Sequence, residues 1–207
     1  MPDKLSGELS LTSPKKVIVL HPCSFTRLGM KHIFSPVCDI RETEYLYECK
    51  EWLLKDEQYD LLILTMNGNG YSAISALKFI DCIVSCNNFI TVIVIMNRPD
   101  EGVGHYLSHY GDKIAVMAES ISLADLVGKV ISRIYPAEGG IKGVIIKKPR
   151  SPCLSEKEVI ILEALLTGHR ACDIAELLHV REKTLSYYKR RGLAKLGVRK
   201  LGHLLDV

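Results

Sequence analysis

The sequence lacks a long apolar run and an export signal. Its longest apolar stretch, Phe89 to Met96, is interrupted by Thr91 and is much shorter than the ~18 residues of a membrane-spanning helix. The first residues do not join a charged segment to an apolar one, as a secretion signal does. We therefore expect a cytoplasmic protein without membrane contact, and we interpret residues 1–14 as a polar tail.

Motifs of metal sites and enzymes are missing as well. The 7 cysteines are scattered, and no CxxC motif adds ligands to Cys82 and Cys86. We expect buried or half-buried thiols, no metal and no cofactor. The turn Asn67-Gly68-Asn69-Gly70 lacks the lysine of a phosphate-binding loop, and no nucleophile–base set surrounds His21. An enzyme is therefore the least favoured class.

The charge that is present is unevenly placed. The chain has 207 residues, of which 47% are apolar, and this suits one large or two small domains. Residues 1–138 contain 13 Lys or Arg against 17 Asp or Glu, whereas residues 139–207 contain 14 against 7. A slightly acidic first part and a basic last part favour a regulatory domain joined to a nucleic-acid-binding domain.

Short apolar strands alternate with amphipathic helices between residues 15 and 135. Strands are expected at 17–20, 38–42, 61–64, 92–95 and 114–117, and helices at 24–34, 44–55, 72–84, 102–110 and 123–135. Leu46, Leu53 and Leu54 are the expected core face of the second helix. Right-handed crossovers place helices on both faces of a parallel sheet, so the pattern predicts a flavodoxin-like α/β domain.

A segment rich in glycine, proline and lysine follows, at residues 136–152. We interpret it as a basic linker, whose charge would add non-specific attraction to DNA. The expected organisation is therefore a tail at 1–14, an α/β domain at 15–135, a linker at 136–152 and a helical domain at 153–207.

The helical domain has the pattern of a helix-turn-helix. Ser155 and Glu158 fit a capping box that begins the first helix. A second helix is expected from Ala171 to Leu178 and a basic third helix from Glu182 to Leu196. A short helix, a tight turn and a basic second helix form the smallest unit that places side chains in a DNA major groove.

The apolar positions of these helices predict a small core. The side chains expected to face inward are Val159, Leu162, Leu165, Leu166, Ile174, Ala175, Leu178, Leu185 and Leu196. Glycine inside a helix costs ~0.5–1 kcal/mol relative to alanine. We therefore expect Gly192 either to permit close packing against Ala175 or to weaken the third helix. Residues 199–206 are expected to form a fourth helix.

This reading frame resembles that of response regulators of the NarL/LuxR class. The segments that match are Leu154-Ser155-Glu156-Lys157-Glu158, Lys183-Thr184-Leu185-Ser186-Tyr187-Tyr188-Lys189-Arg190-Arg191 and Lys195-Leu196-Gly197-Val198. The resemblance implies a receiver-like α/β domain followed by a LuxR-type helix-turn-helix domain that binds double-stranded promoter DNA. It also implies a dimer contact at the fourth helix.

The third helix contains the candidate DNA contacts. Helical spacing puts Ser186, Tyr187 and Arg190 on one exposed side, and the resemblance assigns them to base-facing positions. The forked donors of Arg190 match O6 and N7 of guanine. The candidate phosphate contacts are Lys183, Thr184, Lys189 and Arg191. The alternative is a basic helix face that is only solvated.

The positions that perform phosphorylation in this family have changed here. The family has acidic Mg²⁺ ligands after the first strand, a phospho-accepting aspartate after the third, Ser or Thr after the fourth and Lys after the fifth. The matching positions are His21 and Pro22, Thr65, Ile95, and Ala118 or Glu119. Mg²⁺ prefers hard oxygen ligands, and threonine cannot form an acyl phosphate. We therefore predict a pseudo-receiver without phosphorylation. Asp60 is ~16 Å too far along an extended strand to substitute.

The segment His21-Pro22-Cys23-Ser24-Phe25-Thr26-Arg27-Leu28-Gly29 is similar to auxiliary regulators of the RcsA and BglJ kind. That resemblance implies a heterodimer with an RcsB-like response regulator, with a homodimer as the alternative. Arg27 fits a partner contact and a solvated helix residue equally well. Two other functions stay open: an antagonist that pairs with a regulator, and a ligand sensor at residues 67–70, since open α/β sheets bind ligands at their strand ends.

Overall fold

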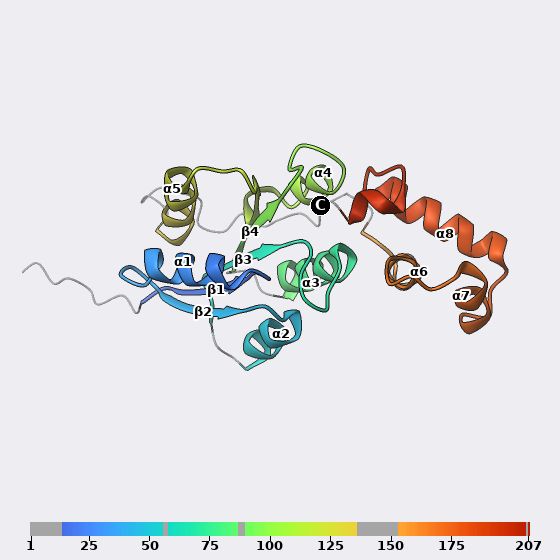
Figure 1. Cartoon of the computed structure of the whole chain (residues 1–207), viewed down its shortest axis with the longest axis horizontal. Helices are drawn as coiled ribbons and strands as arrows, with labels where there is room; N and C mark the ends of the chain where they lie inside the picture. The colour runs from blue at the N-terminus through green and yellow to red at the C-terminus, as the bar shows by residue number, and fades with distance from the viewer. Residues whose placement is uncertain (1–13, 56–57, 87–89, 136–152, 206) are drawn as a thin grey trace, which may run out of the picture.

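The computed structural model describes residues 14–55, 58–86, 90–135, 153–205 and 207 (Figure 1). The predicted linker and all but the last residue of the predicted tail lie outside these residues. None of the helices that the structure describes is long and apolar enough to cross a membrane.

A five-stranded parallel sheet forms the centre of the first domain. Its order is β2-β1-β3-β4-β5. The strands are β1 (Lys16–Leu20), β2 (Asp39–Thr43), β3 (Leu61–Thr65), β4 (Thr91–Met96) and β5 (Ile114–Ala118). Nearly every residue of β1, β3 and β4 is buried, as expected for strands that are covered on both faces. The predicted flavodoxin-like fold is confirmed.

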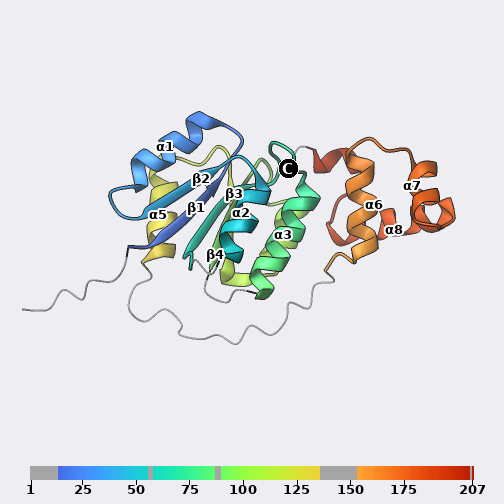
Figure 2. The ribbon, with the colours of Figure 1, turned by 90° about the horizontal axis from the view of Figure 1, so that it is seen from below.

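Five helices cover the two faces of this sheet (Figure 2). They are α1 (Ser24–Phe34), α2 (Leu46–Leu54), α3 (Ala73–Cys86), α4 (Val103–Ser108) and α5 (Leu123–Ile134). Phe34 of α1 and Val130 of α5 pack on one face, while Leu77 of α3 and Leu107 of α4 pack on the other. One expectation for α2 is wrong: Leu54 is 82% exposed, because Leu46 and Cys49 form the buried side of this short helix.

The second domain contains α6 (Glu156–Leu166), α7 (Ala171–Leu177) and α8 (Glu182–Lys195). The capping box of Ser155 and Glu158 is present in full. Ile161, which the sequence analysis left out of the core, is 1% exposed, and it packs with Ile174, Ala175 and Leu185. Val159, Leu165 and Leu166 are only half-buried.

The expected fourth helix at 199–206 is wrong. Among residues 199–205, the part of this range that the structure describes, only a 3-10 turn forms, η2 (Leu201–Leu204). So short a segment gains few helical hydrogen bonds, and Gly202 lowers its helix propensity further. Leu204 is nevertheless fully buried, and Leu201 packs beside it, so tertiary contacts hold the turn.

The two domains share one apolar cluster. Leu162, Leu196 and Leu204 of the helical domain belong to the same cluster as Leu77 of α3 and Tyr106 of α4. The seam is therefore a packed core between the domains, on the α3 and α4 side of the sheet (Figure 1).

Polar contacts reinforce this seam. The hydroxyls of Ser72 and Ser75 donate to the two carboxylate oxygens of Glu163, at 2.6 and 2.8 Å. The amide of Asn67 donates to the carbonyl oxygens of Val207 at 3.2 Å and Leu205 at 3.5 Å. These bonds tie the C-terminal residues to the loop after β3.

The seven cysteines are all free thiols. Cys38 and Cys49 are buried as expected, and burial raises the pKa of Cys49 to about 12. The expectation of burial is wrong for the other five, because they lie at the surface: Cys23, Cys82, Cys86, Cys153 and Cys172. Within the described part of the chain, no group of three or more His, Cys, Asp or Glu side chains could hold a metal ion.

Candidate DNA-binding interface and the altered receiver site

Helix α8 is anchored by one apolar side. Leu185, Leu193 and Leu196 are 1%, 5% and 0% exposed, and Leu185 packs with Ile161 and Ile174 of α6 and α7. These anchors fix the rotation of α8 about its axis. The opposite side therefore faces solvent.

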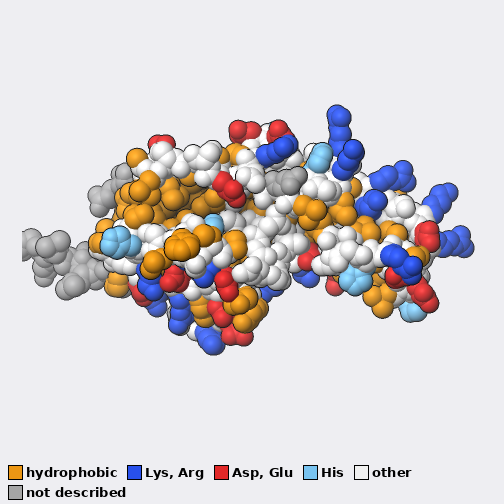
Figure 3. All heavy atoms as spheres, viewed as in Figure 1, with side chains coloured by type: hydrophobic (Ala, Val, Ile, Leu, Met, Phe, Trp, Pro, Cys, Tyr) orange, Lys and Arg blue, Asp and Glu red, His pale blue; other side chains and the backbone are white. Residues whose placement is uncertain are grey.

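Seven residues of α8 are predicted from the sequence to contact DNA. Two of the seven, Thr184 and Lys189, are half-buried. The other five are exposed: Lys183, Ser186, Tyr187, Arg190 and Arg191. Figure 3 shows Lys and Arg side chains standing out from the helical domain, away from the α/β domain. The α/β domain thus leaves this face uncovered.

The polar side chains of α8 also contact one another. Nε of Arg190 donates to the carbonyl oxygen of Ser186 at 3.3 Å. Nη1 of Arg191 donates to the hydroxyl of Tyr187 at 3.3 Å. The ring of Tyr187 meets the ring of Tyr188 edge to face, with 5.6 Å between centroids.

A buried carboxylate lies behind the helix. Glu158 of α6 is 1% exposed. Its Oε2 accepts from Nζ of Lys195 at 2.6 Å and from the backbone N–H of Ser155 at 2.7 Å. Its Oε1 lies 3.3 Å from Nε of Arg191, an ion pair without hydrogen-bond alignment. Burial pushes the pKa of Glu158 upward, but the bonds from Lys195 and Ser155 outweigh it and hold the pKa below its ordinary value.

Gly192 permits close packing, but against a different helix from the one expected. A Cβ atom at Gly192 would lie 2.8 Å from Cδ1 of Leu162 and 3.5 Å from Cβ of Glu158. Both neighbours belong to α6, so the expected contact with Ala175 of α7 is wrong. The missing side chain lets α8 approach α6 closely.

In the α/β domain, His21, Thr65 and Ile95 lie at one edge of the sheet, where the strands end. Thr65 pairs with Ile95 across β3 and β4, and His21 follows β1, where its backbone N–H bonds the carbonyl of Thr43. Burial lowers the pKa of His21, while Glu119, which follows β5, raises it. The fold therefore brings these residues to the edge that the resemblance implied.

A tyrosine packs onto the acceptor position. The hydroxyl of Tyr71 lies 3.2 Å from Oγ1 of Thr65 and donates to the Thr65 carbonyl at 3.3 Å. Tyr71 is 8% exposed, and burial raises its pKa to about 12. Thr65 also donates to the carbonyl of Asn67 at 3.1 Å. The polar atoms of Thr65 are thus bonded within the protein.

Arg27 provides a built-in cation at the same edge. Its Nη1 donates to the carbonyls of His21 at 2.6 Å and Pro22 at 3.1 Å, and to Oε2 of Glu44 at 3.4 Å. Asn69 donates to the same Glu44 oxygen at 3.2 Å. The side chain of Arg27 is only 16% exposed, so it is an internal bridge rather than a solvated residue.

These residues do not fit Mg²⁺, the metal that the receiver resemblance implies. Mg²⁺ needs carboxylate oxygens in near-octahedral order, and the ligand positions hold His21 and Pro22. The nearby carboxylate of Glu44 is already paired with Arg27. Asp60 lies at the other end of β3, where its Oδ1 bonds Nζ of Lys15 at 2.8 Å.

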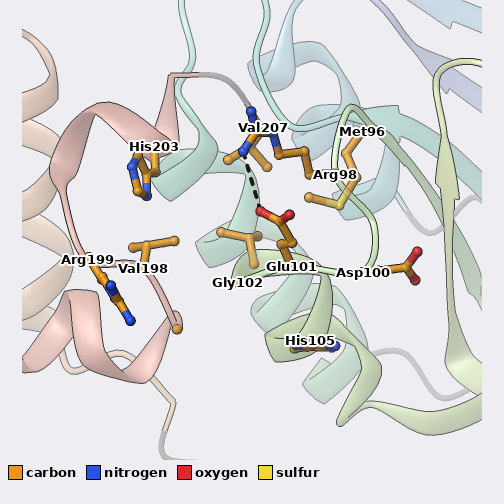
Figure 4. A pocket seen from close by; sticks show the side chains of 12 residues that line it. Met96, Arg98, Asp100, Glu101, Gly102, His105, Val198, Arg199, His203 and Val207 are labelled. Carbon is orange, nitrogen blue, oxygen red and sulfur yellow. Dashed lines mark hydrogen bonds and ion pairs between the residues drawn. The ribbon is translucent and has the colours of Figure 1, made fainter.

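A cavity of about 650 Å³ lies between the domains. Figure 4 shows Val198 and His203 on one side and Met96, Arg98 and Glu101 on the other, with Arg98 paired to Glu101 at 3.4 Å. Residues 67–70, the expected ligand loop, do not line it. The side-chain nitrogen of Asn67 donates to the carbonyls of Leu205 and Val207, and its Oδ1 accepts from the N–H of Ala73.

Residues 152–207 match the family model of "Bacterial regulatory proteins, luxR family". The C-terminal domain is a LuxR-type helix-turn-helix domain. No curated protein matches the chain.

Solved structures resemble the whole chain. RcsB of Salmonella enterica serovar Typhimurium, bound to the promoter rprA with a phosphomimetic, is 19% identical, with a TM-score of 0.56. The match covers 94% of this chain and 100% of that one. A structure of two RcsB dimers on two parallel DNAs is 20% identical, with a TM-score of 0.53 and coverage of 94% and 100%. The likeness shows that the receiver-like sheet and the LuxR-type domain share the RcsB arrangement of folds.

Proposed function

We propose that this protein is a sequence-specific transcription regulator whose receiver-like domain works without phosphorylation. The uncovered basic face of α8 is the observation that carries the proposal. In the proposed complex, the bases are faced by Ser186, Tyr187 and Arg190 of α8. The phosphates are contacted by Lys183, Thr184 and Lys189. Arg191 belongs to the same cluster of DNA-binding residues. The proposal includes domain boundaries at residues 15, 136 and 153, where the α/β domain, the linker and the DNA-binding domain begin. It also includes a cytoplasmic location.

The contacts around Thr65 support the absence of phosphorylation. In this proposal His21, Pro22, Thr65 and Ile95 form a degenerate phosphorylation site. Tyr71 bonds Thr65, and Arg27 holds the carbonyls where a metal would be needed. Because Arg27 is always charged, the positive charge at this edge of the sheet does not depend on Mg²⁺ binding or on phosphorylation. Control by abundance or by a partner then replaces control by a kinase.

The partner is an RcsB-like response regulator, with a homodimer as the alternative. Two exposed apolar residues support a protein partner: Phe25 and Leu28 of α1 are 83% and 62% exposed. Apolar side chains gather over α1 and α5 in Figure 3, and exposed apolar patches mark interaction surfaces. The exposed recognition side of α8 counts against a pure antagonist, which needs no such face.

DNA binding at fixed salt tests the proposal. The full chain is measured by fluorescence anisotropy on promoter DNA, alone and mixed with an RcsB-like regulator. We expect specific binding in the mixture and a loss of ~1–3 kcal/mol for Arg190→Ala, the value of one guanine contact. Glu176→Ala, on the exposed side of α7, is the control. Specific binding without the partner would favour the homodimer, and no specific binding in either case would refute the proposed function.

A further inference from the structure

We propose that Arg191 is a positioning residue: held by buried Glu158, it fixes the ring of Tyr187 so that this ring reads a thymine methyl group. This inference rests on the proposed function and assigns roles within the same DNA-binding face. The observation behind it is a chain of contacts that runs from the core of the domain to its exposed side.

The chain begins at a rigid group. Glu158 is 1% exposed and is held by the Ser155 backbone and by Lys195. Its second oxygen, Oε1, lies 3.3 Å from Nε of Arg191 and has no hydrogen-bond partner among the described residues. Removing a partner from a buried charge is costly. Arg191 is therefore drawn toward the helix pair, although 54% of its side chain is exposed.

The other end of the guanidinium holds Tyr187. Nη1 of Arg191 donates to the Tyr187 hydroxyl at 3.3 Å, and the ring of Tyr188 borders the Tyr187 ring at 5.6 Å. Tyr188 itself is half-buried in the small core. Two neighbours thus orient a ring that is still 51% exposed.

An oriented and exposed aromatic ring suits one feature of the major groove. Thymine is the only base that presents a methyl group there, and apolar side chains recognise it by contact. A guanidinium that is ion-paired at one end and hydrogen-bonded at the other is less suited to contact a phosphate. Tyr187 therefore reads thymine, while Arg191 acts through Tyr187.

The experiment replaces thymine by deoxyuridine, which removes the methyl group alone. A DNA site is first selected from a random duplex library with the full chain, together with its partner if binding requires it. Affinity is then measured on duplexes with one deoxyuridine at each thymine position, at several salt concentrations. The variants are Tyr187→Phe, Arg191→Lys and Arg191→Met, with Lys183→Met as the phosphate-contact control.

For the natural chain, deoxyuridine at one thymine position should lower the affinity for the duplex about fourfold, the effect of burying one methyl-sized group. Arg191→Lys keeps the charge but cannot hold Glu158 and Tyr187 together, so it should lose this discrimination and keep the salt slope. Tyr187→Phe, which removes only the bonded hydroxyl, should weaken the discrimination. Lys183→Met should bind more weakly to every duplex and reduce the salt slope by about 1.

Other results overturn the inference. If Arg191→Lys behaves like the natural chain while Arg191→Met reduces the salt slope as Lys183→Met does, Arg191 contacts phosphate. If no thymine position is sensitive in the natural chain, Tyr187 does not read the methyl group. If the library yields no site for the natural chain, the proposed function itself fails. Thermal unfolding of each variant identifies any loss of folding.

Discussion

The guanidinium of Arg27 illustrates what a single residue does at the strand ends of the sheet. It bonds two backbone carbonyls after β1 and a carboxylate after β2, so it joins the ends of these two strands. A half-buried cation with three acceptors contributes more to the stability of the fold than a surface ion pair does. If the cation were removed, its acceptors would lose their hydrogen-bond partner.

Replacing Arg27 should therefore destabilise the fold. We expect Arg27→Met to lower the free energy of unfolding by ~1–3 kcal/mol, since it leaves part-buried acceptors unbonded. The control is Lys31→Met, which breaks an ion pair to Glu42 whose lysine is 47% exposed and should cost less than ~1 kcal/mol. Urea unfolding of the full chain provides both values. Equal losses in the two variants would show that Arg27 does not bridge the strand ends.

Glycines inside helices show the same logic at the scale of an element. Gly192 of α8 has no room for a methyl group, because Leu162 would lie 2.8 Å away in a fully buried position. Gly29 of α1 has nothing within 4 Å of the same atom. Alanine would gain the same helix propensity at both positions, but only Gly29 has room for the added methyl group.

Alanine at these two glycines should therefore change stability in opposite directions. Gly29→Ala should stabilise the protein by ~0.5–1 kcal/mol through helix propensity. Gly192→Ala gains the same propensity, but overpacking against Leu162 costs ~1–3 kcal/mol, so a net loss is expected. Chemical unfolding measures both variants. A stabilised Gly192→Ala protein would mean that α6 and α8 can separate freely.

Element boundaries followed closely from sequence because local patterns set them. The capping box of Ser155 and Glu158 began α6 where expected, and β-branched apolar runs located the strands. The expected fourth helix is wrong because Leu201 and Leu204 are held by contacts with the other domain, not by helix propensity. The solvent-exposed side of α8 was also predictable, since Leu185 and Leu196 fix which side is buried.

The joint between the domains could not be predicted from the sequence. Ser72, Ser75 and Glu163 are ordinary polar residues of helix ends and helix sides, and nothing local pairs residues about 90 positions apart. The same holds for Arg191 and Tyr187: helical spacing put both on α8, but the ion pair of Arg191 with Glu158 depends on how α6 and α8 pack.

At the scale of the whole molecule, the shared apolar cluster predicts that the two domains unfold together. Leu162, Leu196 and Leu204 lose their cover if the α/β domain withdraws, so the helical domain alone would expose apolar side chains. Cooperative unfolding is expected when elements share one core. Trp52, the single tryptophan, reports on the α/β domain, and hydrogen exchange of the α8 amides reports on the other.

Both probes should therefore give one transition midpoint in urea. The variant Glu163→Ala removes the hydrogen bonds that Ser72 and Ser75 donate across the seam while leaving the interior of each domain intact. The exchange midpoint of α8 should then fall below the Trp52 midpoint, because the helical domain opens first. The variant Glu176→Ala, which changes an exposed residue away from the seam, should keep the two midpoints together. Separate midpoints in the natural chain would contradict the shared core, since domains joined only by a linker unfold independently.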